Sequence, residues 1–164
     1  MTFYRCNLPH WFPNGKALFI TWNLHASIRD RHYLARPEIA QIIVDALRYA
    51  QTQLHLNELH AWVIMSNHVH ILIDPHAPLP RITKSIKNFS AREANQILHL
   101  TGTPFWQNES YDHWVRDRAE FDRIADYIEL NPVTAGLVGR PEDWRWSSAS
   151  VGREAYTTKE SRAR

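Results

Sequence analysis

Apolar residues follow two periods along the chain, and these periods predict its helices and strands. Spacings of three and four residues predict amphipathic helices over residues 37–54 and 81–97, the first with Pro37 in its first turn. Runs rich in β-branched and aromatic residues predict strands over residues 16–24, 58–65 and 68–74. Only a short turn at Ser66-Asn67 separates the last two, which therefore predict a β-hairpin.

The second half of the chain completes the pattern. Residues 102–117 read as irregular or extended, and we place a fourth strand there. A third helix is expected over residues 119–130, ending before Pro132 because proline cannot donate a helical hydrogen bond. This order predicts an α+β fold: a ferredoxin-like antiparallel sheet with helices on one face, plus an added C-terminal helix. We expect one domain over residues 1–150 and a flexible tail over residues 151–164.

Composition narrows the class of protein without identifying it. The 164 residues are 44% hydrophobic, enough for the core of one domain, and the net charge of +2 permits a nucleic-acid partner. Cys6 is the single cysteine, which excludes an internal disulfide and a cysteine-rich zinc site and favours a reducing compartment. No apolar stretch approaches the ~18 residues of a membrane span. We therefore expect a cytoplasmic protein with no membrane partner.

Two histidines stand one residue apart in the strand predicted over residues 68–74. Side chains alternate along a strand, so His68 and His70 share one face. The opposite face, toward the predicted helices, carries Val69, Ile71 and Ile73. Two neutral imidazoles can share a divalent cation if a third ligand is present, but a surface position on an uncovered sheet face is an equally open alternative. His60 and His113 are reserve candidates for the metal.

The predicted third helix carries a second polar pair. Tyr127 and Asn131 are four residues apart, which places them on one helical face. A tyrosine can act as a covalent nucleophile, and an amide oxygen suits a hard cation. The alternative is that Tyr127 is a core residue and that Asn131 only ends the helix. Tyr111 is the second candidate nucleophile.

Basic and aromatic side chains supply possible contacts to nucleic acid. Basic residues that could neutralise phosphates are Arg81, Lys84, Lys87, Arg92, Arg116, Arg118 and Arg123. Aromatic residues that could stack on unpaired bases are Trp106, Tyr111 and Trp114. The alternatives are a solvated helix face for the charges and the protein core for the tryptophans.

Three motifs, in order, resemble one known family. "MSNHVHILI" (residues 65–73) resembles the Met-Pro-Asn-His-Val-His segment of single-tyrosine HUH transposases, with Ser66 at a turn position where proline is more usual. "YIELNPV" (127–133) resembles their Tyr-Ile-x-x-Asn-Pro-Val core, and "PEDWRWSSA" (141–149) resembles a Trp-Ser-Ser ending. The similarity extends over residues 16–149 and is strongest to the REP-associated tyrosine transposases.

The resemblance implies a chemistry for the polar residues. His68 and His70 would hold Mg²⁺ or Mn²⁺ with help from Asn131, and Tyr127 would be the nucleophile. Such an enzyme cleaves and rejoins single-stranded DNA hairpins through a 5′-phosphotyrosine intermediate, as a monomer or a homodimer, and would be nucleoid-associated. The alternative is a catalytically silent DNA-binding protein of the same fold. A hydrolytic two-histidine metalloenzyme is disfavoured because no HExxH-like spacing supplies a third strong ligand.

Overall fold

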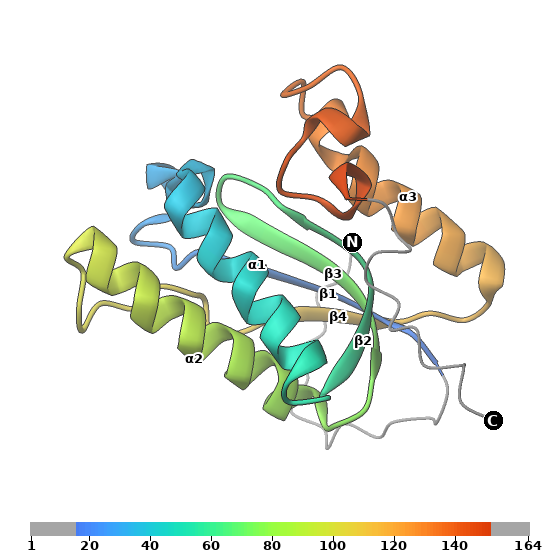
Figure 1. Cartoon of the computed structure of the whole chain (residues 1–164), viewed down its shortest axis with the longest axis horizontal. Coiled ribbons are helices and arrows are strands. Elements are labelled where there is room, and N and C mark those ends of the chain that lie inside the picture. Colours follow the sequence, from blue (N-terminus) through green and yellow to red (C-terminus); the bar gives the residue numbers. More distant parts are fainter. Residues whose placement is uncertain (1–15, 152–164) are drawn as a thin grey trace.

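A four-stranded antiparallel sheet forms the centre of the computed structural model, which describes residues 16–151 (Figure 1). Its strands are β1 (Leu18–Asn23), β2 (Asn57–Ile64), β3 (His68–Pro75) and β4 (Tyr111–Trp114). They lie in the order β2-β3-β1-β4, and each neighbouring pair is antiparallel. With the intervening helices this is the ferredoxin-like topology, so the predicted α+β fold is confirmed.

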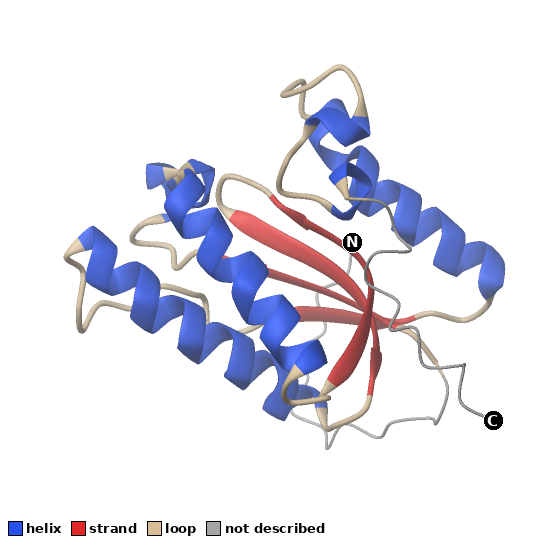
Figure 2. Cartoon of the chain, viewed as in Figure 1, coloured by secondary structure: helices blue, strands red, loops and turns tan. Residues whose placement is uncertain are grey.

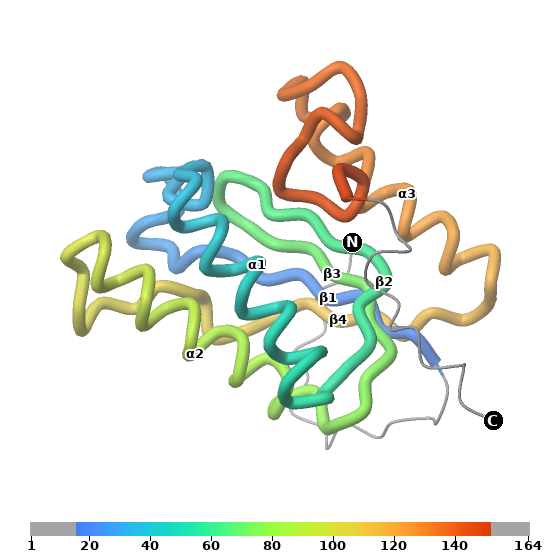
Figure 3. The backbone as a smooth tube through the Cα atoms, viewed as in Figure 1, coloured from blue at the N-terminus to red at the C-terminus, as the bar shows by residue number. Residues whose placement is uncertain are grey.

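The three long helices divide between the two faces of the sheet. Helices α1 (Pro37–Thr52) and α2 (Leu79–Leu98) lie side by side on one face, whereas α3 (Arg118–Thr134) lies apart from them (Figures 1, 2 and 3). The short 3-10 helices are η1 (Arg29–Arg31), η2 (Tyr33–Ala35), η3 (Pro141–Asp143) and η4 (Ser148–Ser150). Within the described residues, no helix is both long and apolar enough to cross a membrane.

Each face of the sheet has its own apolar cluster. Val69, Ile71 and Ile73 pack with α1 and α2 in the larger cluster, as their alternation along the strand predicts. Leu72 points the other way and packs with Ile128 of α3 in the second cluster. Helix α3 therefore covers part of the face that carries His68 and His70, which sequence reasoning left open as an uncovered surface.

The end of α3 corrects one prediction. We expected the helix to stop before Pro132, but it continues through this residue to Thr134. The proline removes only the hydrogen bond to Ile128, and the helix ends two residues later, where Ala135 N–H donates to the Asn131 carbonyl. Asn131 consequently keeps helical geometry one turn beyond Tyr127.

The Trp-Ser-Ser segment lies along the outer edge of β2. Ile64 N–H donates to the Trp146 carbonyl at 2.8 Å, Trp144 Nε1 donates to the Ile64 carbonyl at 3.0 Å, and Ser147 bridges to Val63. These contacts occupy backbone groups of an edge strand that would otherwise face solvent. The tail expected over residues 151–164 lies outside the described residues except for its first position.

Candidate catalytic and metal-binding site

A cavity of about 520 Å³ opens between α3 and the strands β1 and β3. It is lined by Thr21, Asn23, His68, His70, Tyr127, Asn131, Thr134 and Ala135. The predicted nucleophile and all three predicted metal ligands therefore lie around one space, although they come from two distant parts of the sequence.

His70 is held in place by contacts on several sides. The residue is only 6% exposed, and its Nδ1 lies 2.6 Å from Thr21 Oγ1. Its ring stacks on Phe19 with 5.7 Å between the centroids, and the ring of Tyr127 lies 5.5 Å away. Because Nδ1 faces Thr21, Nε2 is the nitrogen left to bind a metal. Burial, with a smaller effect from His68, lowers the pKa of His70 to about 3, so this imidazole is neutral at physiological pH.

His68 repeats the arrangement with a different partner. Its Nδ1 lies 2.7 Å from Asn67 Oδ1, which again leaves Nε2 as the nitrogen that can bind a metal, and its ring centroid is 4.8 Å from that of His70. Burial lowers the pKa of His68, and the positive charge of Arg29 lowers it further. Metals bind neutral imidazole, so two neutral rings this close can coordinate one cation. The burial of His70 contradicts the alternative that both histidines are surface side chains.

Tyr127 is accessible at the mouth of this site. The residue is 53% exposed, which contradicts the alternative of a core tyrosine. Its ring packs edge-on against Phe19, with 6.2 Å between the ring centroids, and the ring of Tyr111 packs against the same phenylalanine with 6.1 Å between the centroids. Both candidate nucleophiles therefore flank Phe19, but of the two only Tyr127 lines the cavity with the histidines.

The reserve metal ligands lie elsewhere. His113 Nε2 is 3.1 Å from Glu120 Oε1, in a contact that joins β4 to α3. His60 lies beside Asp74, toward the far end of the β2–β3 hairpin. Neither histidine lines the cavity that contains Tyr127.

The basic residues expected to contact DNA occupy different surroundings. Arg81 and Lys84 are exposed on α2, and Arg92 is paired with Glu93. The Nζ atom of Lys87 donates to the Gln107 carbonyl at 3.0 Å, and burial lowers the pKa of Lys87 to about 8. Helix α2 packs on the sheet face opposite to α3, so these charges are not neighbours of Tyr127.

The basic residues near α3 are the closer set. Arg123 is exposed on α3, only one turn before Tyr127. Arg116 instead binds Glu120 through Nη2 at 3.0 Å and through its backbone N–H at 2.7 Å. These contacts lower the pKa of Glu120 to about 2, so that the pair stays ionised.

Sequence reasoning missed three residues that support the site. Thr21 and Asn67 orient the histidines, and Ser148 connects β2 to the tyrosine helix. Ser148 is fully buried. Its Oγ donates a hydrogen bond to Glu129 Oε1 at 2.8 Å and accepts one from the backbone N–H of Trp62 at 3.1 Å. A polar threonine in the apolar first strand was the available signal for Thr21. The Ser148–Glu129 contact left no local signal because it joins separate segments.

Comparison with known proteins identifies the class. The family model described as "Transposase IS200 like" matches residues 22–131, which include both histidines, Tyr127 and Asn131. The chain belongs to this family of transposases, enzymes that act on DNA.

Two known proteins within this class are similar to the chain. The REP-associated tyrosine transposase of Escherichia coli (strain K12) is 26% identical over 142 residues, covering 83% of this chain and 81% of the relative. A solved structure of the REP-associated tyrosine transposase bound to a REP hairpin matches with a TM-score of 0.65 at 21% identity, covering 99% of this chain and 93% of the other. That structural match supports the ferredoxin-like fold derived above.

Proposed function

We propose that this protein cuts and rejoins single-stranded DNA at hairpin-forming, REP-like palindromes, through a covalent 5′-phosphotyrosine on Tyr127. The observation that carries the proposal is the shared cavity, where an accessible tyrosine stands beside two neutral, oriented imidazoles. The REP hairpin bound to the structural relative supports a hairpin as the substrate.

The donor atoms at the cavity fit a divalent cation such as Mg²⁺ or Mn²⁺. The Nε2 atoms of His68 and His70 and the side-chain oxygen of Asn131 would hold it, and open positions would remain for phosphate oxygens. When bound, the cation would supply positive charge to the phosphate oxygens as negative charge develops on them. The hydroxyl of Thr21 and the amide of Asn67 keep both rings in a binding orientation.

The chain itself supplies the covalent step. Tyr127 Oη attacks the scissile phosphorus and loses its proton, and the bond from phosphorus to the 3′ oxygen breaks. The 3′ oxygen takes up a proton and leaves as a hydroxyl, while the 5′ phosphate remains on Tyr127. The number of phosphodiester bonds is unchanged, so attack by a 3′-hydroxyl can reverse the step without ATP. Exposure of Tyr127 gives a DNA strand direct access to Oη.

The arrangement of charges and of the site suggests how DNA is held. Exposed Arg81, Lys84 and Arg123 are available to phosphates, whereas Lys87, Arg92 and Arg116 would first have to give up contacts within the protein. The histidines and Tyr127 line one cavity of a single chain, so we propose that a monomer suffices for cleavage and that a homodimer is not required.

The test is covalent capture of DNA. Purified protein is mixed with a labelled single-stranded hairpin from the palindromes around its gene, with and without Mg²⁺ or Mn²⁺, and run on a denaturing gel. We expect a metal-dependent adduct that Tyr127→Phe abolishes and the matched control Tyr111→Phe retains. Loss of the adduct in Tyr111→Phe alone would assign the nucleophile to Tyr111. Hairpin binding with no adduct in any metal would support the catalytically silent alternative.

A further inference from the structure

A second group of metal-ligating side chains lies near the far end of the β2–β3 hairpin. Glu58 of β2 and Asp74 of β3 are direct partners in the antiparallel register, and both belong to partly exposed residues. Like charges placed opposite each other destabilise a strand pair. A neighbouring cation would turn this repulsion into an attraction.

A β-bulge brings a histidine to the same place. Leu59 pairs with Ile73 and Ala61 pairs with Leu72, so His60 is an extra residue in β2. Bulges of this kind redirect a side chain. The ring of His60 lies on the α3 side of the sheet, where it packs edge-on against Phe121 with 5.1 Å between the ring centroids.

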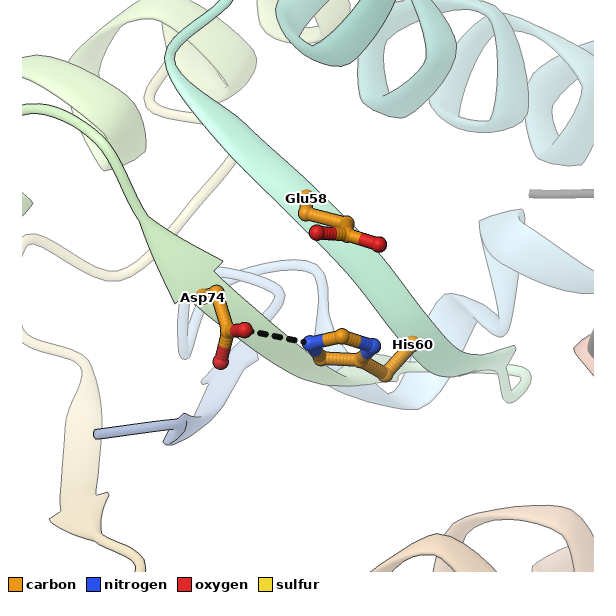
Figure 4. Close-up of side chains that lie close together, drawn as sticks. All are labelled: Glu58, His60 and Asp74. Carbon is orange, nitrogen blue, oxygen red and sulfur yellow. Dashed lines mark ion pairs between the residues drawn. The ribbon is translucent and has the colours of Figure 1, made fainter. Parts of the chain in front are cut away.

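The three side chains converge. One ligand atom from each of Glu58, His60 and Asp74 lies within 4.8 Å of the others. Figure 4 shows the three side chains and the contact between His60 and Asp74. His60 Nε2 is shielded from solvent and lies 3.0 Å from Asp74 Oδ2, a contact that pairs the imidazole with this carboxylate. A metal would bind the nitrogen and both carboxylates together.

We propose that Glu58, His60 and Asp74 form a second divalent-cation site that binds zinc or a similar ion. One imidazole and two carboxylates match this ion, whose bonds of about 2.0–2.2 Å place neighbouring ligands roughly 3–3.5 Å apart. The side chains would close by about an ångström on binding, a movement that partly exposed carboxylates allow. Solvent would complete the coordination.

The proposed site is distinct from the tyrosine cavity and does not depend on the proposed function. Asp74 follows His70 by four residues, which is about 13 Å along a strand. The position of the proposed site indicates a structural role. The cation would join β2 to β3 beneath Phe121, near the start of α3. It would therefore stabilise the strands on which the helix of Tyr127 packs, and would take no part in the chemistry.

The test measures zinc binding by the full chain after metal is removed. A His68→Ala/His70→Ala protein first removes the ligands of the tyrosine cavity. We expect this protein still to bind one Zn²⁺ in isothermal titration calorimetry, with an increase in melting temperature. Adding Asp74→Asn or Glu58→Gln should weaken that binding by at least about tenfold. Equal zinc affinity with and without these substitutions would overturn the proposal.

A second measurement uses the unaltered protein, in case the variants do not fold. Paramagnetic Co²⁺, which occupies zinc sites, is added in small amounts while amide NMR signals are recorded. We expect two separate centres of broadening, one at residues 58–60 and 74 and one at residues 68–70. An effect that is strongest at 68–70 and only decreases with distance toward 58–60 and 74 would refute the second site. The Mg²⁺-dependent adduct on Tyr127 should be unchanged in Asp74→Asn, so failure of this proposal and failure of the proposed function remain distinguishable.

Discussion

The buried imidazole of His70 makes the stability of this protein sensitive to mild acid. In an unfolded chain this histidine has an ordinary pKa of 6.5, whereas burial in the folded protein lowers it to about 3. Between these values the unfolded chain binds a proton that the folded protein does not. The stability contribution is therefore complete above pH 6.5 and is lost progressively as the pH falls toward 3.

The expected magnitude follows from the size of this shift. One pKa unit corresponds to about 1.4 kcal/mol, so lowering the pH from 7 to 5 should cost about 2 kcal/mol through His70 alone. His68, whose pKa burial also lowers, adds to the loss in the same direction. Solvent screens the charge of a protonated His70 only weakly, because the residue is 6% exposed.

Urea unfolding followed by tryptophan fluorescence at pH 7, 6 and 5 measures this effect. EDTA is present, since bound metal would also compete with protons. The informative comparison is with His70→Gln, which cannot titrate: the native protein should lose about 2 kcal/mol more than this variant between pH 7 and 5. The exposed control His76→Gln should follow the native protein. Equal losses in native protein and His70→Gln would refute the inference that His70 is held neutral by burial.

Two further substitutions test the contacts that support the site. Thr21→Val should weaken Mn²⁺ binding by about 10–100-fold in calorimetry, because His70 Nδ1 loses its partner, and Thr21→Ser should restore it. Unchanged affinity in the valine variant would remove Thr21 from any positioning role. Ser148→Ala should lower the free energy of unfolding, measured by urea unfolding, by about 1–3 kcal/mol. The buried backbone N–H of Trp62 and the carboxylate of Glu129 would both lose their hydrogen bond to this hydroxyl. A loss below about 0.5 kcal/mol would show that Ser148 does not anchor α3 to the sheet.

Periodicity along the chain determined most of the architecture. The helix over 37–54, the hairpin around Ser66 and the alternation of His68 with Val69 all follow from side-chain direction within one element. These features depend on neighbours in sequence, and each is present in the structure. The spacing of Tyr127 and Asn131 is similarly local, and it survives because Pro132 stands close enough to the end of α3 to be tolerated.

Tertiary structure alone decided what surrounds those side chains. Alternation places His70 on a face, but only the packing of α3 across that face puts Tyr127 beside it and buries the imidazole. Thr21 reaches His70 across 49 positions of sequence, and the bulge in β2 turns His60 toward Asp74. Burial, ring orientation and pKa are properties of contacts between distant segments, and one-dimensional spacing does not encode which segments will meet.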